Sequence, residues 1–309
     1  MTNLSMILPK ALQQLGPEKI YLPLPHGRAS AWSFGAGTPV LCLHGFPDNC
    51  LTFRHQVKPL VQAGYRVILP VMRGYEPGSI QPDGRYYMAD LAEDTVRWVD
   101  RIGVDKVHLV GHDWGAVSAW AAVGLAPERL LSVTSIAIPY LKHAAKGIQA
   151  HPQQLLNSWY MSFFQLRGLA DWGVSAADWW FIKRLWKRWS PDYVAPPDVL
   201  NSVLNTFRQT GVKKAALGYY RCMYDAFSAP GRASHQLLRC AVAVPALLIT
   251  GENDGCIDTR LFETTYRARD FLSDVQLERL SGAGHFAQLE KPDVVTGLLL
   301  DFFEKSGRS

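Results

Sequence analysis

The 309-residue chain has few cysteines, no long apolar run and no strong excess of either charge. Its five cysteines are odd in number and scattered without metal-ligand spacing, so we expect reduced thiols, no bound metal and a cytoplasmic location. No apolar run approaches the roughly 18 residues of a membrane span, and we expect no secretory signal in residues 1–20. The net charge of +5 comes without a basic stripe, which argues against nucleic-acid binding.

Short apolar runs are plentiful, and they alternate with helical patterns over most of the chain. Such runs are typical of strands buried on both faces of a parallel sheet, whereas two early runs read as antiparallel strands. We therefore predict an α/β fold with a mostly parallel central sheet and helices on both faces. The predicted strands are residues 19–22, 29–34, 39–43, 65–70, 107–110, 130–138, 244–250 and 275–280.

The alternation breaks between residues 139 and 233. This segment has helical stretches but no convincing buried strand, and six of the ten tryptophans of the chain fall in it. We predict that it forms a helical cap, or lid, domain of residues 139–233. The core domain would then combine residues 1–138 and 234–309.

A sharp turn is predicted where the strand ending near Gly111 meets the next helix. Residues 111–115 read G-x-D-x-G, and glycines lower the steric cost of a strand-to-helix turn that lifts its central side chain above the sheet. This turn usually carries serine at its centre, so Asp113 excludes a serine esterase. The alternative interpretation of Asp113 is a plain helix N-cap.

Reactive residues also follow other strands, at the sheet edge where ligands bind in α/β proteins. Asp254 follows the strand ending near residue 250, and His285 follows the last strand. The order nucleophile Asp113, acid Asp254, base His285 is the α/β-hydrolase order. Asp258 lies close to Asp254, so the choice of acid stays open between them.

Four motifs resemble the α/β-hydrolase-fold epoxide hydrolases. They are H-G-F-P at 44–47, R-G-Y at 73–75, G-H-D-W-G-A at 111–116 and G-H-F at 284–286, and the resemblance covers about 38–140 and 244–303. Residues 159–165 and 219–223 resemble the two cap segments that bear ring-opening tyrosines. The resemblance implies that Tyr160 and Tyr220 donate protons. Glu76-Pro77 departs from the shorter, glycine-rich turn of many members.

The chemistry follows from the residue types. A carboxylate is ionised at neutral pH, so Asp113 can attack carbon directly and form an alkyl ester. His285, oriented by Asp254, would activate the water that hydrolyses this ester. The backbone N–H groups of Phe46 and Trp114 are the predicted oxyanion hole. The predicted substrate-binding residues are Phe46, Trp114, Trp159 and Phe164.

These inferences favour a cofactor-independent epoxide hydrolase that acts on a small apolar epoxide and water. The alternative is a haloalkane or haloacid dehalogenase with the same Asp/His pair, which the indole of Trp114 suits. Phe46 lacks a side-chain amide for halide, however, and two lid tyrosines suit an alkoxide better. A non-catalytic ligand-binding protein is a third hypothesis, against which the complete triad argues. Substrate identity stays open, and the cap is the candidate surface for a homodimer.

Overall fold

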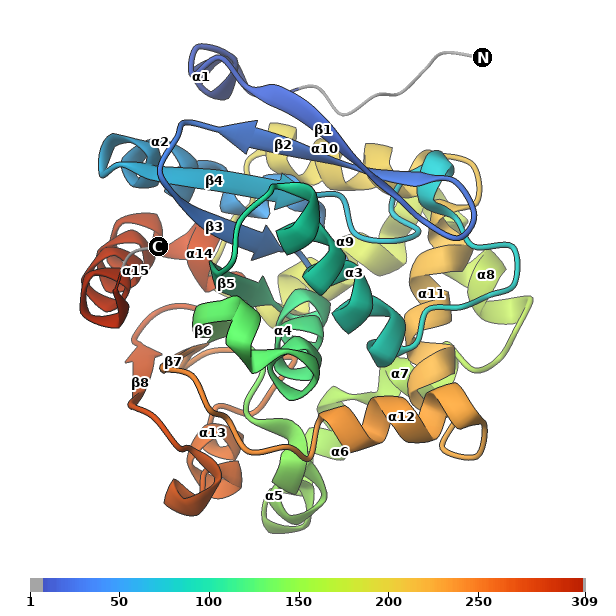
Figure 1. Cartoon of the computed structure of the whole chain (residues 1–309). Helices are drawn as coiled ribbons and strands as arrows, with labels where there is room; N and C mark the ends of the chain where they lie inside the picture. The colour runs from blue at the N-terminus through green and yellow to red at the C-terminus, as the bar shows by residue number, and fades with distance from the viewer. Residues whose placement is uncertain (1–7, 308–309) are drawn as a thin grey trace.

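A computed structural model describes residues 8–307, and its centre is an eight-stranded sheet covered by helices (Figure 1). The strand order is β1-β2-β4-β3-β5-β6-β7-β8. The β1–β2 and β2–β4 pairs are antiparallel, and every other pair is parallel. The predicted α/β fold is confirmed. The strands are β1 Glu18–Pro23, β2 Arg28–Phe34, β3 Thr38–Leu43, β4 Tyr65–Pro70, β5 Val107–His112, β6 Leu130–Ile136, β7 Ala246–Gly251 and β8 Val275–Leu280.

Two predicted strand boundaries need correction. Strand β6 ends two residues early because Ala137 takes a positive φ of 66°. Strand β7 begins at Ala246 because the preceding proline has no N–H for the ladder. Between β7 and β8 the chain forms α13 (Arg260–Thr265) and a separate 3-10 turn (Ala268–Asp270).

Two helix layers cover the sheet. Helices α2 (Arg54–Gln62) and α15 (Pro292–Ser306) pack together and against β4 and β6. Helices α3 (Met88–Arg101) and α4 (Trp114–Leu125) pack together, and α4 lies on β3, β5 and β6. In Figure 1, α15 and α4 stand on either side of β6. The small, fully buried side chains of α4 allow this close approach to the sheet.

Residues 139–233, between β6 and β7, form helices joined by short connections, with no strand. In Figure 1 the green and orange helices of this segment lie at the right and at the bottom, and a yellow one lies near the top, behind the first strands. The predicted cap boundary after residue 233 falls inside α12, which packs against α3 and α4 of the core. The division into core and cap domains stays a prediction. The helices are α5 Ala144–Ala150, α6 Gln153–Asn157, α7 Trp159–Phe163, α8 Leu169–Gly173, α9 Ala176–Trp189, α10 Pro197–Arg208, α11 Val212–Met223 and α12 Ala229–Leu237.

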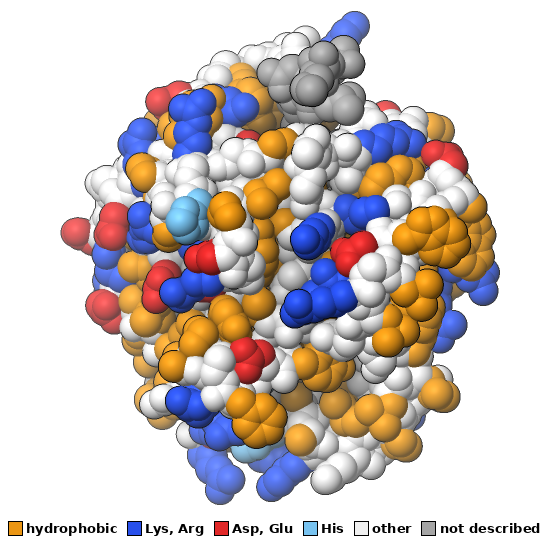
Figure 2. Space-filling view, turned by 90° about the vertical axis from the view of Figure 1, so that its right-hand side faces the viewer, with side chains coloured by type: hydrophobic (Ala, Val, Ile, Leu, Met, Phe, Trp, Pro, Cys, Tyr) orange, Lys and Arg blue, Asp and Glu red, His pale blue; other side chains and the backbone are white. Residues whose placement is uncertain are grey.

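The outer surface of the inserted helices mixes apolar and basic side chains. Helix α9 buries one face and exposes a basic one, and its first turn is distorted by positive φ angles at Ala177, Asp178 and Trp179. Figure 2 shows apolar and basic side chains interspersed on the face that it displays. Within residues 8–307, no helix is both long and apolar enough to cross a membrane. The exposed large apolar side chains of α6–α9 and their connections are Leu155, Leu156, Trp159, Leu166, Leu169, Trp172 and Trp180.

Candidate active site

Asp113 sits on a strained turn between β5 and α4. Its φ of 51° and ψ of −119° lie outside the regions that L-residues ordinarily occupy. Close backbone packing explains the flanking glycines: a Cβ at Gly111 would lie 2.3 Å from the carbonyl oxygen of Gly115, and one at Gly115 would lie 2.0 Å from that of Leu43. Asp113 occupies the N-cap position of α4, but its side chain makes no capping hydrogen bond, so capping does not explain the carboxylate at this position.

The structure brings Asp113, His285 and Asp254 into a line at the carboxyl edge of the sheet. His285 Nε2 lies 3.6 Å from Asp113 Oδ2, and His285 Nδ1 donates to Asp254 Oδ2 at 2.9 Å. Backbone N–H groups of Cys256 and Ile257 fix the other oxygen of Asp254, at 2.7 and 3.0 Å. This geometry supports Asp254 as the orienting acid.

Asp258, the alternative acid, is engaged elsewhere. Its carboxylate forms an ion pair with Arg260 at 2.6 Å, and this pair lowers the pKa of Asp258. The backbone N–H of Asp258 also donates outside the triad, to Gln154 Oε1. The hydrogen-bond partners of the two acids therefore favour Asp254, and its role as the orienting acid stays a prediction.

The charges around His285 stabilise its protonated form. Burial alone would lower the pKa of this imidazole, but the carboxylates of Asp254 and Asp113 outweigh burial and raise the pKa to about 10. In the free enzyme, an imidazolium thus lies between two carboxylates. Any reaction that removes the charge of Asp113 also removes part of the support for that proton.

Two other buried histidines hold the loops and stay neutral. Burial lowers the pKa of His44 to about 4 and that of His112 to about 3. His44 Nε2 accepts the Met72 N–H at 3.1 Å. His112 Nε2–H donates to the carbonyl of His285 at 3.0 Å. These histidines position the backbone next to the site.

The loop after β3 points a backbone donor at the nucleophile. The Phe46 N–H donates to Asp113 Oδ1 at 2.7 Å, and the Phe46–Pro47 peptide bond is cis. A Cβ at Gly45 would lie 2.4 Å from the Cβ of Asp113, so glycine is needed for this approach. Trp114, the other predicted oxyanion donor, is the first residue of α4. The pair's role in stabilising an oxyanion stays a prediction.

Tyr160 of α7 and Tyr220 of α11 are buried together, with ring centroids 5.7 Å apart. The hydroxyl of Tyr160 lies 3.4 Å from Cys256 Sγ. The hydroxyl of Tyr220 lies near the side chain of Trp114. Burial, with added repulsion from Asp113, raises the pKa of both phenols well above 10. Both phenols are therefore protonated at neutral pH, and their role as proton donors stays a prediction.

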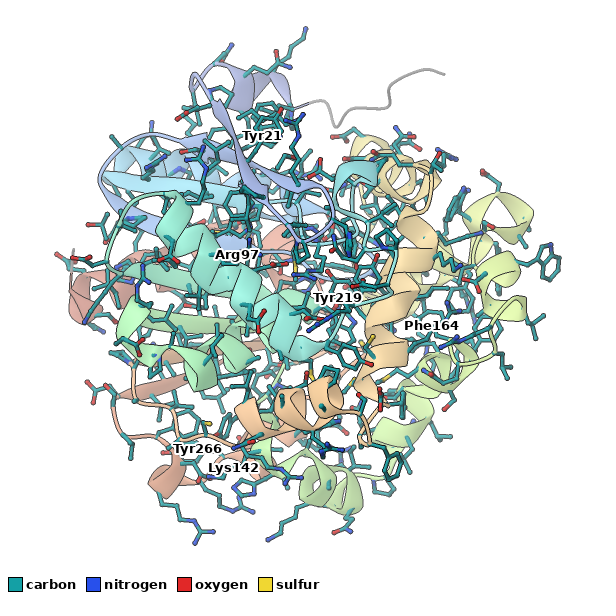
Figure 3. The ribbon with its side chains drawn as sticks, turned by 45° about the vertical axis from the view of Figure 1, so that its right-hand side comes forward. Tyr21, Arg97, Lys142, Phe164, Tyr219 and Tyr266 are labelled. Atoms are coloured by element: carbon teal, nitrogen blue, oxygen red, sulfur yellow. The ribbon has the colours of Figure 1, made fainter. Side chains whose placement is uncertain are left out.

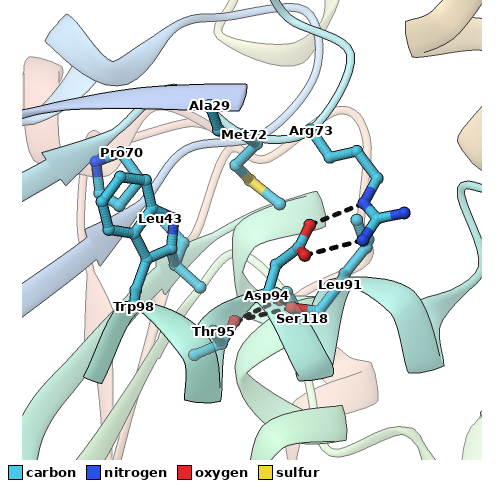
Figure 4. A pocket seen from close by; sticks show the side chains of 10 residues that line it. All are labelled: Ala29, Leu43, Pro70, Met72, Arg73, Leu91, Asp94, Thr95, Trp98 and Ser118. Atoms are coloured by element: carbon cyan, nitrogen blue, oxygen red, sulfur yellow. Dashed lines mark hydrogen bonds and ion pairs between the residues drawn. The ribbon is translucent and has the colours of Figure 1, made fainter. Parts of the chain in front are cut away.

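The neighbouring Tyr219 has a different task. Its hydroxyl donates to the Arg73 carbonyl at 2.5 Å, and the Arg73 guanidinium pairs with Asp94 at 2.7 Å. Figure 3 shows Tyr219 on the side of α11 that faces α3, with Phe164 on the other side. Figure 4 shows the Arg73–Asp94 pair beside a cavity of about 20 Å³, room for about one water. Tyr219 thus joins α11 to the core.

An aromatic wall adjoins the nucleophile, and three of the four predicted substrate-binding residues belong to it. Ring centroids of Phe46, Phe164 and Tyr220 lie 5.0–5.5 Å apart, and Trp114 meets Tyr220 at 5.1 Å. Trp159 lies outside this wall. Its ring is 44% exposed and packs against Phe163 and Phe181, because α7 directs Tyr160 inward and turns the adjacent residue outward.

Three residues near the site were missed from the sequence. The carbonyl of Trp189, at the end of α9, accepts the N–H groups of Gly255 and His285, both at 3.1 Å. Glu290 accepts the N–H groups of the residues on either side of His285, at 2.8 and 3.0 Å. Cys256 lies beside Asp113 and His285. Only Cys256 carried a sequence signal, its place two residues after Asp254.

Comparisons with known proteins agree with this geometry. The family model described as "alpha/beta hydrolase fold" matches residues 38–292. The chain is 31% identical to epoxide hydrolase A of Mycobacterium tuberculosis, covering 86% of this chain and 90% of that protein. It is 29% identical to human epoxide hydrolase 4, covering 88% and 74% of the two chains. A crystal structure of a putative epoxide hydrolase from Klebsiella pneumoniae superposes with a TM-score of 0.80 at 23% identity, covering 93% of this chain and 96% of that one. The chain belongs to the epoxide hydrolase family of α/β-hydrolase-fold enzymes.

Proposed function

We propose that this enzyme opens epoxides to vicinal diols through a covalent ester on Asp113. The proposal rests on one observation: a set of core residues and a pair of phenols face each other across one buried site. On the core side, Asp113 is aligned with His285 and Asp254. On the side of the inserted helices, two buried phenols, Tyr160 and Tyr220, face it. A nucleophile opposite two acids fits the opening of a strained ring.

In the first step, a carboxylate oxygen of Asp113 attacks a ring carbon and the carbon–oxygen bond of the epoxide breaks. The oxygen that departs takes a proton from Tyr220 or Tyr160. The Phe46 N–H holds the second carboxylate oxygen at 2.7 Å and so orients the nucleophile. The product of this step is an alkyl ester with a free hydroxyl.

Ester formation removes the negative charge of Asp113, which is one of the two charges that raise the pKa of His285. The pKa of the imidazole then falls, and its proton can restore the phenol. The neutral imidazole is now a base, still oriented by Asp254 at 2.9 Å. The same histidine is thus an ion-pair partner before the first step and a general base after it.

In the second step, His285 takes a proton from water, and the hydroxide adds to the carbonyl carbon of the ester. We infer that the N–H groups of Phe46 and Trp114 stabilise the oxyanion. Collapse breaks the acyl–oxygen bond, and the departing alkoxide takes the remaining proton of the added water. The diol leaves, and carboxylate and imidazolium are restored.

A single turnover in isotopically labelled water tests this scheme. With enzyme in excess over epoxide, we expect unlabelled diol and labelled Asp113, because the new oxygen of the diol comes from the carboxylate. Label in the diol of the first turnover would contradict the covalent intermediate. Halide release from haloalkanes without epoxide turnover would favour the dehalogenase alternative instead.

The aromatic wall supports a small apolar epoxide as substrate, with water as the second reactant. The exposed apolar side chains of α6–α9 and their connections support a homodimer that forms through the inserted helices. A cytoplasmic location is a separate part of the proposal. We also keep the prediction that residues 139–233 act as a lid over the core.

A further inference from the structure

A thiol that the proposed reaction does not use lies at the centre of the site. One carboxylate oxygen of Asp113, Cys256 Sγ and one imidazole nitrogen of His285 all lie within 4.8 Å of one another, and all three residues are buried. Carboxylate, thiolate and imidazole are the ligand types that bind zinc in proteins. The reaction scheme explains Asp113 and His285 but leaves Cys256 without a task.

The spacing of these atoms is close to that of a tetrahedral metal site. Zinc lies about 2.0–2.3 Å from its ligands, so two ligand atoms of a tetrahedral site lie about 3.3–3.8 Å apart. Asp113 Oδ2 and His285 Nε2 already lie 3.6 Å apart. The thiol completes the set with a shift of about 1 Å at most.

The surroundings of His285 also resemble those of a metal ligand. Its Nδ1 is held by Asp254 at 2.9 Å, which directs Nε2 towards the other two ligand atoms. A carboxylate behind a histidine is the usual support of a zinc ligand. Nε2 is buried, and its contact with Asp113 Oδ2, at 3.6 Å, is longer than a hydrogen bond. A metal ion between these two atoms would bind both of them directly.

The charges balance as well. The carboxylate of Asp113 and the thiolate of Cys256 together neutralise a divalent cation, so a buried ion would not be left uncompensated. Three protein ligands leave a fourth position of a tetrahedral site open. The hydroxyl of Tyr160 lies 3.4 Å from Cys256 Sγ. Hard cations such as Mg²⁺ prefer oxygen ligands, so this set selects against them.

We propose that Asp113, Cys256 and His285 form a site for Zn²⁺ whose occupation switches the enzyme off. The binding site follows from the geometry alone. The inhibition rests on the proposed function, because the ion would occupy the nucleophile and the base together.

Cobalt spectroscopy tests the site without any epoxide. We expect chelator-treated protein to take up one equivalent of Co²⁺ with a thiolate-to-cobalt charge-transfer band. Cys256→Ala and Cys256→Ser should both lose this band, with circular dichroism verifying that each variant is folded. Cys240→Ala is the matched control, because Cys240 is the only cysteine that is not buried, and it should keep the band.

Asp254→Asn sharpens the test. Loss of a supporting carboxylate typically weakens metal binding by about 10–100-fold, so this variant should need more Co²⁺ but show the same band at saturation. Absence of the band in the unsubstituted protein, its persistence in both Cys256 variants, or its loss in Cys240→Ala would overturn the proposal. Failure of epoxide turnover would leave the cobalt result unchanged, so the two proposals fail separately.

Discussion

The core and the inserted helices build their halves of the site by different physical means. In the core, backbone hydrogen bonds place the reactive groups: Phe46 N–H fixes Asp113, and two N–H groups fix Asp254. In the inserted helices, ring packing places Tyr160 and Tyr220, whose centroids lie among other aromatic rings. A backbone loop tolerates many side chains around one required residue. A packed aromatic layer depends on every ring in it.

This difference predicts that substitutions in the core abolish single steps, whereas substitutions in the inserted helices slow the reaction by degrees. The experiments below test that contrast, in order of the size of the expected effect.

The largest effect is expected for His285→Gln. Without the base, the ester on Asp113 should form but not hydrolyse, and steady-state turnover should fall at least about a thousandfold. Mass spectrometry after epoxide treatment should find one substrate adduct, on the peptide that contains Asp113. Unmodified protein would contradict the role of Asp113 as nucleophile.

Asp254→Asn and Asp258→Asn form a matched pair in the acid loop. Asp254→Asn should lower kcat by about a hundredfold or more, because the imidazole loses its orienting partner. Asp258→Asn should change kcat less than about threefold, since its carboxylate pairs with Arg260 at the surface. Comparable losses in both variants would contradict the assignment of the acid.

Tyr220→Phe and Tyr219→Phe separate chemistry from packing in α11. Tyr220→Phe removes a proton donor and should slow ester formation by about a hundredfold in a rapid-mixing experiment. Tyr219→Phe removes a hydrogen bond to Arg73 and should cost about 1 kcal/mol of the free energy of unfolding. Equal effects of both on ester formation would remove the distinction between these adjacent tyrosines.

The ion pair of His285 gives a prediction about pH. A pKa raised from 6.5 to about 10 in the folded state stabilises the protein fully below pH 6.5, and this stabilisation is lost as pH rises towards 10. Asp113→Asn removes part of it, so its loss of unfolding free energy should be larger at pH 6 than at pH 10. Urea denaturation at both values measures this, and a nuclear magnetic resonance titration should find a lower pKa for His285 in the variant. A pH-independent loss would contradict the ion pair.

The smallest effect is expected at the surface. Replacing Trp172 and Trp180, which are 68% and 59% exposed, by serine should leave kcat within about twofold, because neither ring belongs to the aromatic wall. If the inserted helices form a dimer interface, size-exclusion chromatography should show a shift towards monomer. An unchanged elution volume would argue against that interface.

The sequence predicted the core better than the inserted helices, for a physical reason. A buried parallel strand needs a continuous apolar run, and the reactive residue after it is fixed by chain connectivity, as with Asp113 after β5. Adjacent tyrosines at 219 and 220 carry no such signal, because a helix points them in different directions that only its packing decides. Trp159 illustrates this: the sequence predicted that it binds substrate, but the helix directs its neighbour Tyr160 inward and leaves Trp159 exposed.

Some features lay beyond any residue pattern. The carbonyl of Trp189 bonds to two loops, and every residue has such a carbonyl, so the sequence could not single it out. The partners of Glu290 are backbone N–H groups, which nearly every residue has, so the sequence could not single out this contact either. The distorted first turn of α9 at Ala177–Trp179 carried little signal, since of its three residues only Asp178 is of a type enriched at positive φ.

The Trp189 carbonyl ties the inserted helices to the two loops that carry Asp254 and His285. One oxygen at the end of α9 accepts the N–H of Gly255 from one loop and the N–H of His285 from the other. Displacing that end of α9 would break both hydrogen bonds together. A single backbone oxygen thus gives two loops, distant in the sequence, one common anchor on the inserted helices.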